Sequence, residues 1–506
     1  MPSAAPTEKP AGNGGRTAAP ARPTLRFDRA LLVHPLGYRA DAAGSDIARL
    51  ANIMPPLGLL SIAAWLEARG VGVAIIDAYA RPDARARLRE RLEADRPAFV
   101  GLSCTTSGFL DAVHLAEEAK AILPGVHTVV GGAHVSALRE QALEGFPALD
   151  FGVVGEGERT FGELIAGGWE TPASVPGLVY RDGDGTPRFT GRRSDLVELD
   201  ELPFPAYEKL PGFPEAYTLP IFNYPRTPNT ACVSSRGCPY ACTYCDRSVF
   251  GRSFRHNSAD YMLALLRDLH GRFGIRHVNF YDDQFTFHRG RVEAFARGLA
   301  DSGLRMTFNC AARAEHLDAD LLAAMKAAGC WMISLGIETG DPALLARHRR
   351  NADLDRLRDC IAQIKRAGIR VKGLLMMGLP GETAETIRRS MDYVFSLPLD
   401  DFNLSKFTPF PGSPAYADIR AHGTFDEDWE KMDCLHFQFV PDGLTRAELE
   451  TLHRAFYRRH FLRPRVLWDY TTMVWRSPDS WRRFWRHAGA FLRFARSERR
   501  LAGESA

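Results

Sequence analysis

The chain lacks the features that mark membrane-spanning, exported and nucleic-acid-binding proteins. It has no run of about 18 apolar residues, so the sequence predicts no membrane-spanning helix. Its first residues contain no apolar stretch of the kind found in secretory signal peptides, and we expect a cytoplasmic protein. The formal net charge is only +3 over 506 residues, and no known nucleic-acid-reading module is present, so we expect no nucleic-acid partner.

Cysteine is scarce, which argues against a disulfide-stabilised fold. The chain has nine cysteines, and in a reducing compartment clustered cysteines are more often metal ligands than disulfide partners. Only Cys238, Cys242 and Cys245 are clustered. The others are scattered along the chain, as is typical of small buried apolar residues.

A chain of 506 residues is too long for a single hydrophobic core, so we expect two or three domains. The leader is rich in Ala, Pro, Gly and Thr and has too few large apolar residues to fold. The apolar pattern divides the chain into a disordered leader (1–27), an α/β domain (28–168), a hairpin with a Pro-rich linker (169–228), a partial barrel (229–420) and a helical region rich in Arg and aromatic residues (421–506).

The α/β domain alternates short apolar runs with helical periodicity. We expect strands at 31–35, 71–77, 98–104, 127–132 and 150–155, and helices at 57–69, 84–95 and 109–122. This alternation predicts a doubly wound parallel sheet. Such sheets bind ligands beyond the carboxyl ends of their strands. Small and polar residues there would let the backbone approach a large ligand, and they include Ser103, Thr105, Gly131, Gly132, Gly155 and Glu156.

Strand–helix alternation resumes at residue 229. We expect strands at 230–235, 277–283, 305–309, 331–339, 371–378 and 402–409, with helices at 258–273, 289–302, 317–328, 353–367 and 383–396 between them. These repeats fall short of a complete TIM barrel, so the sequence predicts a partial (β/α)6 barrel.

The three clustered cysteines stand in CxxxCxxC spacing on the loop after the first barrel strand. Four-iron clusters normally take four cysteines, so three on one loop would leave one iron open to another ligand. The alternative is a structural zinc site, but zinc prefers four protein ligands and His256 is the only histidine close by. The motif therefore favours a 4Fe–4S cluster.

This motif at the end of the first strand of a partial barrel resembles the radical S-adenosylmethionine (SAM) superfamily. The resemblance implies that the open iron binds SAM, and that an electron donor such as flavodoxin or ferredoxin drives its cleavage to a 5′-deoxyadenosyl radical. It also implies site roles: Tyr244 beside adenine, Asp282 and Asp283 at the methionine amino group, Arg313 at the SAM carboxylate, and Glu338 at the amino or ribose groups. Structural alternatives are a helix N-cap for the two aspartates and a core ion pair for Glu338.

The first domain, with VGLSCTTS, VVGGAH and VVGEGE at its expected strand ends, resembles the cobalamin-binding domain that precedes many radical SAM cores. The DxHxxG motif, whose histidine ligates cobalt in other cobalamin proteins, is absent, and His34 and His134 lack its spacing. The resemblance therefore implies cobalamin without a protein histidine ligand. A degenerate domain that serves only as a scaffold is the alternative.

Together these resemblances imply a flavodoxin-like cobalamin domain, a radical SAM partial barrel and a cobalamin-dependent enzyme. The leading expectation is a C-methyltransferase that acts at an unactivated carbon of a small-molecule or lipid-like substrate. One alternative is an oxidative cyclase or rearrangement enzyme that resembles the magnesium-protoporphyrin monomethyl ester cyclases. A second alternative, of another class, is a non-catalytic corrinoid or redox sensor. Methylthiolation is disfavoured because the sequence has no second cysteine trio.

The carboxyl-terminal stretch carries most of the positive charge. Residues 451–500 contain 13 arginines, no lysine and three acidic residues, a net charge of +10. A basic amphipathic helix of this kind can contact a membrane surface peripherally. We expect instead that its stripe packs on the protein and that its arginines are solvated; the stripe comprises Trp481, Phe484, Trp485, Ala488, Phe491, Leu492 and Ala495.

Overall fold

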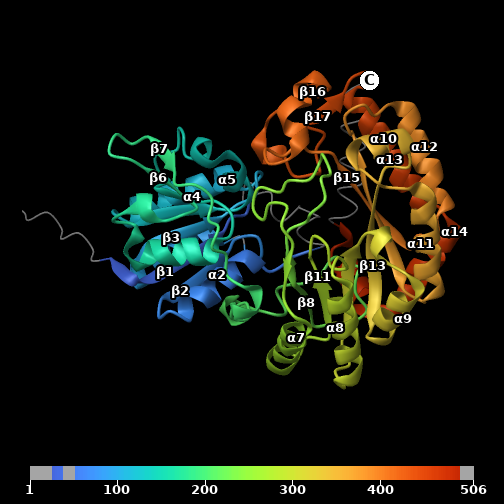
Figure 1. Cartoon of the computed structure of the whole chain (residues 1–506), viewed down its shortest axis with the longest axis horizontal. Coiled ribbons are helices and arrows are strands. Elements are labelled where there is room, and N and C mark those ends of the chain that lie inside the picture. The colour runs from blue at the N-terminus through green and yellow to red at the C-terminus, as the bar shows by residue number, and fades with distance from the viewer. Residues whose placement is uncertain (1–24, 38–51, 82, 490–506) are drawn as a thin grey trace, which may run out of the picture.

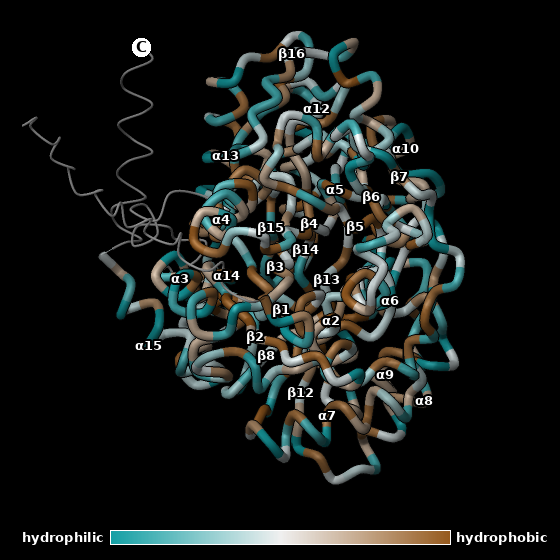
Figure 2. Tube along the Cα trace, turned by 90° about the vertical axis from the view of Figure 1, so that its left-hand side faces the viewer, coloured by the Kyte–Doolittle hydropathy of each residue, from teal (hydrophilic) through white to brown (hydrophobic). Residues whose placement is uncertain are grey.

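The computed structural model describes residues 25–37, 52–81 and 83–489. It contains two α/β domains, each built on its own sheet, that lie side by side (Figure 1). The predicted leader lies outside the described residues except for its last three positions. The first strand already begins at Arg26, two residues before the expected start of the domain. Hydrophobic segments gather on the strands of both sheets (Figure 2).

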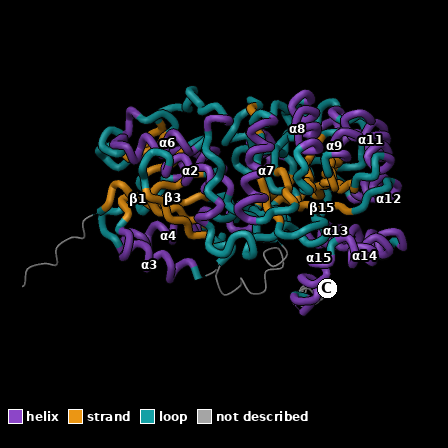
Figure 3. Tube along the Cα trace, turned by 90° about the horizontal axis from the view of Figure 1, so that it is seen from below, coloured by secondary structure: helices purple, strands orange, loops and turns teal. Residues whose placement is uncertain are grey.

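The first sheet has the strand order β2-β1-β3-β4-β5-β6-β7. Its parallel strands are β1 (Arg26–His34), β2 (Gly72–Asp77), β3 (Pro97–Ser103), β4 (His127–Gly131) and β5 (Phe151–Val153). Helices α2 (Leu57–Glu67) and α6 (Gly157–Glu163) cover one face, and α3 (Ala84–Asp95) and α4 (Phe109–Ile122) cover the other (Figure 3). The predicted doubly wound sheet is confirmed.

The predicted hairpin does not belong to a linker. Its strands β6 (Leu178–Arg181) and β7 (Pro187–Phe189) pair antiparallel and extend the first sheet beyond β5. The edge of β5 would otherwise leave backbone groups unpaired, and the hairpin satisfies them while it buries Leu178 and Val179. The connector between the two sheets therefore starts after the hairpin.

The second sheet is parallel, in the order β15-β14-β13-β12-β11-β8. Its strands are β8 (Asn229–Cys232), β11 (His277–Phe280), β12 (Thr307–Ala312), β13 (Cys330–Glu338), β14 (Arg370–Met377) and β15 (Asp401–Lys406). The predicted helices are α7 (Ala259–Phe273), α8 (Arg289–Asp301), α9 (Ala319–Ala327), α11 (Leu354–Arg366) and α12 (Ala384–Ser396). This confirms the partial barrel. A further short helix, α10 (Pro342–His348), has no counterpart in the sequence prediction.

The carboxyl-terminal region combines a small hairpin with three helices. Strands β16 (Gly423–Phe425) and β17 (Phe439–Pro441) pair antiparallel. The loop between them carries Trp429, whose ring lies 4.5 Å from that of His134 in the first domain. Helices α13 (Arg446–Phe461), α14 (Pro464–Arg476) and α15 (Pro478–Arg486) follow. No helix in the described part of the chain is long and apolar enough to cross a membrane.

The predicted aromatic stripe packs on the protein only in part. The rings of Trp481 and Phe484 lie 5.4 and 6.3 Å from the ring of Phe222, whereas Trp485 is 67% exposed. The expectation that the arginines are solvated is wrong for Arg483, which is buried and donates hydrogen bonds to the Leu219 carbonyl and the Tyr224 hydroxyl at 2.9 and 2.8 Å. Phe491, Leu492 and Ala495 lie outside the described residues.

Candidate functional site

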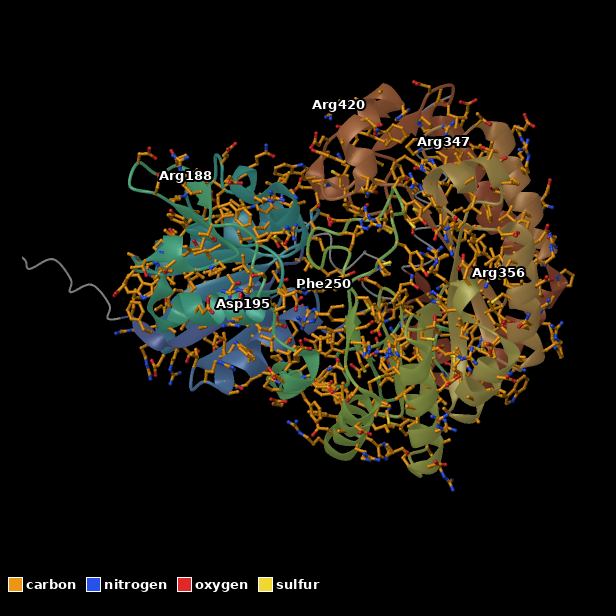
Figure 4. The ribbon with its side chains drawn as sticks, viewed as in Figure 1. Arg188, Asp195, Phe250, Arg347, Arg356 and Arg420 are labelled. Atoms are coloured by element: carbon orange, nitrogen blue, oxygen red, sulfur yellow. The ribbon has the colours of Figure 1, made fainter. Side chains whose placement is uncertain are left out.

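A cavity of about 240 Å³ lies between the first domain and the barrel. The first domain lines it with residues at the carboxyl ends of its strands, and the barrel lines it from both ends of the cysteine loop. The barrel residues that line it include Ser235 and Arg236 before the motif and Val249 and Phe250 after it. Phe250 lies between the two domains in Figure 4.

Most residues predicted to bind cobalamin line this cavity: Ser103, Gly131, Gly132, Gly155 and Glu156. Thr105 is not among the lining residues, and its hydroxyl lies 3.3 Å from that of Ser107. Glycine backbone forms part of this wall, beside apolar side chains such as those of Leu32 and Phe161. Gly132 has a φ of +123°, and a Cβ there would lie 2.2 Å from the Cys104 carbonyl oxygen, so only glycine fits. Glycines in the wall let a cofactor such as cobalamin approach the backbone closely.

The Glu156 carboxylate forms ion pairs with Arg236 and with Arg255, both of which belong to the barrel. Glu156 therefore lines the cavity, and its charge joins the first domain to the barrel.

Glu158 makes a second link to the barrel. It accepts hydrogen bonds from Arg236 Nη2 at 2.6 Å and from the Ser61 hydroxyl at 2.6 Å. Burial alone would raise the pKa of Glu158, but the positive charge and hydrogen bond of Arg236 hold it below its ordinary value. Glu158 is therefore ionised where it meets the barrel.

The cysteine loop is held by a short antiparallel pair at its two ends, β9 (Ser235–Arg236) and β10 (Arg255–His256). Gly237 begins the loop with a φ of +87°, and a Cβ there would lie 2.0 Å from the Ser253 carbonyl oxygen. Within the loop Cys238 is half-buried, Cys242 is buried and Cys245 is exposed.

Cys242 is poised to be a thiolate. A hydrogen bond from Cys245 lowers the pKa of Cys242 to about 5, and the charges of Arg313 and Arg349 act in the same direction. The thiolate is the form of cysteine that binds metals. No His, Cys, Asp or Glu trio in the described residues is grouped to hold a metal ion. The cysteines of a four-iron cluster each bind a different iron, so they need not converge on one point.

The Asp282 carboxylate, which is predicted to contact the SAM amino group, is buried and hydrogen-bonded within the protein. Its side chain is fully enclosed and accepts hydrogen bonds from the Ser234 backbone N–H and hydroxyl at 2.6 Å and from the Ser235 hydroxyl at 2.8 Å. Arg291 lies 3.6 Å away and offsets its charge. Asp282 thus anchors the start of the cysteine loop. Neither aspartate is a helix N-cap, since α8 is capped by His288.

Asp283 is exposed beside Asp282. Its carboxylate accepts a hydrogen bond from the backbone N–H of Gly237, at the start of the cysteine loop.

Arg313 and Glu338 lie beside the cysteine loop, and Tyr244 belongs to the loop itself. Arg313 Nη1 lies 3.9 Å from the Cys242 sulfur, and its guanidinium stacks 3.8 Å from the ring centre of Tyr240. Glu338 has a φ of +65°, a strained conformation of the kind found at functional sites. Burial raises the pKa of Glu338 to about 7 although Arg349 opposes the shift.

The Tyr244 hydroxyl forms a hydrogen bond with Glu338, and its ring packs against a buried apolar cluster that includes Leu344 and Leu379. Arg349 lies 3.9 Å from Glu338, as the ion-pair alternative for Glu338 predicted.

Sequence reasoning missed three arginines at this site, Arg236, Arg255 and Arg349. Arg236 directly precedes the glycine of the cysteine motif, and two acidic residues stand in the GEGE run of the first domain. This complementary charge could have predicted an ion pair between Arg236 and the GEGE run. Arg349 directly follows α10, the helix absent from the prediction.

Two family models match the chain. Residues 232–394 match the radical SAM superfamily, and residues 45–165 match the B12 binding domain. The two matches fall on the two sheets that border the cavity.

Two relatives and one solved structure are similar to most of the chain. An uncharacterized methyltransferase of Pyrococcus horikoshii is 29% identical over 82% of this chain and 89% of its own length. The anaerobic magnesium-protoporphyrin IX monomethyl ester cyclase of Rubrivivax gelatinosus is 26% identical over 86% of this chain and 77% of its own. The structure of the radical SAM methyltransferase TsrM from Kitasatospora setae, bound to cobalamin and a 4Fe–4S cluster, superposes with a TM-score of 0.63 at 20% identity, over 78% of this chain and 75% of that one.

Proposed function

Since this chain belongs to the cobalamin-binding radical SAM enzymes, we propose that it is a C-methyltransferase that acts at an unactivated carbon of a small-molecule or lipid-like substrate. The observation that carries the proposal is the shared cavity. Arg236 and Phe250, on either side of the cysteine motif, line the same space as Ser103 and Gly131 at the strand ends of the first domain. Methyl transfer to a carbon radical needs both cofactors close to one substrate atom.

In this proposal Cys238, Cys242 and Cys245 hold the 4Fe–4S cluster. Their place on one loop, whose two ends are joined by the β9–β10 pair, supports that role. Arg313 and Glu338 are the candidate SAM contacts, because both lie near Cys242 on the cysteine loop; Arg313 can pair with a carboxylate, and the Glu338 carboxyl can accept a hydrogen bond from an amino group. The predicted division between a cobalamin domain (28–168) and a radical SAM barrel (229–420) is kept, with the hairpin of β6 and β7 added to the first.

The cofactors supply a 5′-deoxyadenosyl radical and a methyl group, and the residues of the chain bind, orient and exclude water. Reductive cleavage of SAM consumes an electron, so an electron donor such as flavodoxin or ferredoxin is part of the proposal. The exposure of Cys245 supports access to such a donor. Cobalamin is expected to bind without a protein histidine below the cobalt.

The test is an anaerobic assay of the reconstituted full chain with SAM labelled in its methyl group, cobalamin, a reductant and candidate substrates. Methylation predicts equal amounts of 5′-deoxyadenosine and S-adenosylhomocysteine, because one SAM is cleaved and another gives up its methyl group. The product should gain one labelled methyl. Formation of neither 5′-deoxyadenosine nor S-adenosylhomocysteine would contradict an enzyme and favour a corrinoid sensor.

An oxidative cyclase remains the second candidate, because the Rubrivivax gelatinosus relative carries that name and aligns over 86% of this chain. The same assay separates the two reactions. A cyclase would form 5′-deoxyadenosine without S-adenosylhomocysteine, and its product would carry no label.

A further inference from the structure

One side of helix α14 presents large apolar side chains to solvent. Leu467, Trp468, Val474 and Trp475 are 54%, 70%, 44% and 76% exposed. Thr471 between them is also exposed. At about 3.6 residues per turn these positions fall on one side of the helix, so they form a continuous stripe, which we call the α14 face. A continuous apolar patch on a protein surface often marks an interaction site.

The opposite side of α14 packs against the barrel. Val466 and Met473 are buried, and Asp469 forms two hydrogen bonds of 2.8 Å with Arg370 at the start of β14. The Tyr470 hydroxyl lies 3.4 Å from Asp401 at the start of β15. These contacts fix the rotation of the helix, so the tryptophans cannot turn inward without breaking a largely buried ion pair.

Positive charge surrounds the α14 face. Residues 458–489 contain eight arginines and no lysine. Their acidic residues are Asp469, which pairs with Arg370 at 2.8 Å and with Arg476 at 3.5 Å, and Asp479, which accepts a hydrogen bond from Tyr224. By helical periodicity, Arg465 and Arg476 follow the two tryptophans around α14. Both are exposed, as are Arg482 and Arg486 on α15.

The α14 face lies at the end of the barrel opposite the cysteine loop. Arg370 and Asp401, which hold α14, begin their strands, whereas the cysteine motif follows the carboxyl end of β8. Figure 3 shows α14 and α15 on the outside of the barrel domain. A partner on this face would therefore leave the catalytic end free.

We propose that the α14 face docks the protein on an anionic lipid surface. Exposed tryptophans flanked by arginines are the composition of helices that lie in a membrane interface, where the indole rings sit among the headgroups and the arginines meet the phosphates. A second copy of the chain is a poorer occupant, because a symmetric contact would bring two arginine-rich surfaces together. This proposal stands apart from the methylation proposal and needs no cofactor.

The test is co-sedimentation of the full chain with vesicles of phosphatidylcholine mixed with phosphatidylglycerol, compared with phosphatidylcholine alone. We expect binding to the anionic vesicles to be about tenfold stronger and to weaken at high salt. The variant W468S/W475S should lose about tenfold through the lost apolar contact, and R465E/R476E should lose at least as much through the lost charge.

The matched control is R267E/R297E, which makes the same charge change at exposed positions on α7 and α8 and should bind normally. Quenching of tryptophan fluorescence by brominated anionic lipid checks insertion in the unmodified protein, so the test does not depend on a variant that folds. The proposal is wrong if the full chain ignores anionic vesicles, or if the control variant loses as much binding as R465E/R476E. It is also wrong if light scattering shows a dimer that W468S/W475S dissociates while vesicles remain unbound.

Discussion

Arg236 and Glu158 join the cysteine loop to the first domain: Arg236 Nη2 lies 2.6 Å from Glu158 Oε1, and Arg236 precedes Cys238 by only two residues. Both side chains are largely buried, at 14% and 6% exposure. Removal of one partner from such a buried pair leaves an uncompensated charge, which typically costs about 3–5 kcal/mol. The pair therefore fixes the position of the cysteine loop against the first domain.

Glu158→Gln should reduce methylation of the substrate more than it reduces cleavage of SAM to 5′-deoxyadenosine. Glutamine keeps the shape of the side chain but removes the charge that holds Arg236, so the loop and the first domain would lose their alignment. We expect methylated product to fall about tenfold relative to 5′-deoxyadenosine, because small displacements of reacting groups cost large factors in rate. Glu163→Gln, which affects pairs with Arg159 and Arg193 outside the cavity lining, should leave the ratio unchanged. Equal loss of both products in Glu158→Gln would contradict a positioning role.

The triple variant C238A/C242A/C245A should contain no cluster. Each of these cysteines supplies one ligand in the proposal, and no other cysteine lies within the motif. Iron and sulfide analysis of the anaerobically reconstituted protein measures the result. Cys360→Ala serves as the control, since Cys360 is buried within helix α11 and should leave the iron content unchanged. An intact cluster in the triple variant would refute the assignment.

Bound cobalamin should carry no histidine nitrogen below the cobalt. His34 Nδ1 lies 3.0 Å from Asp77, and the ring of His134 lies 4.3 Å from that of Phe109 and 4.5 Å from that of Trp429. Electron paramagnetic resonance of the cobalt(II) state should show no nitrogen superhyperfine splitting. Nitrogen splitting that disappears in His34→Gln or His134→Gln would refute this prediction.

Most of the secondary structure of both domains could be predicted, because the longer helices and the sheet strands have local signals, whereas the short helix α10 was missed. The helices expected at 84–95 and 109–122 have those bounds in the structure, since apolar residues recur there every three or four positions. The ion pairs at the site carry no local signal. Arg236 and Glu156 are 80 residues apart in the sequence, and Arg255 and Glu156 are 99 apart.

The role of Asp282 could not be predicted for a related reason. The YDDQF run shows a carboxylate at a strand end, but only the folded loop shows that Ser234 and Ser235 occupy it. The turn residues 182–185, Asp-Gly-Asp-Gly, indicate the hairpin of β6 and β7, whereas its pairing with β5 depends on an open sheet edge that no local pattern shows.

The stability of the barrel should depend on pH through Glu382, which is 1% exposed in the loop after β14. Burial raises the pKa of Glu382 to about 8, although the backbone N–H groups of Gly378 and Leu379 act against the shift. The folded state therefore holds this proton more tightly than the unfolded state, whose carboxyl has its ordinary pKa of about 4.3. Stability from this group is fully present below that ordinary value and is lost as pH rises toward about 8.

Glu382→Gln should remove this dependence, because glutamine stays neutral and can still accept a backbone hydrogen bond. As pH rises, we expect the free energy of unfolding of the variant to increase relative to that of the native protein, by an amount on the order of a few kcal/mol. Thermal melting of both proteins below about pH 5 and above about pH 8 measures the difference. Glu385→Gln is the matched control, since its side chain is 80% exposed three residues away. Parallel melting profiles for Glu382→Gln and the native protein would mean that Glu382 titrates normally, and that the two N–H groups outweigh its burial.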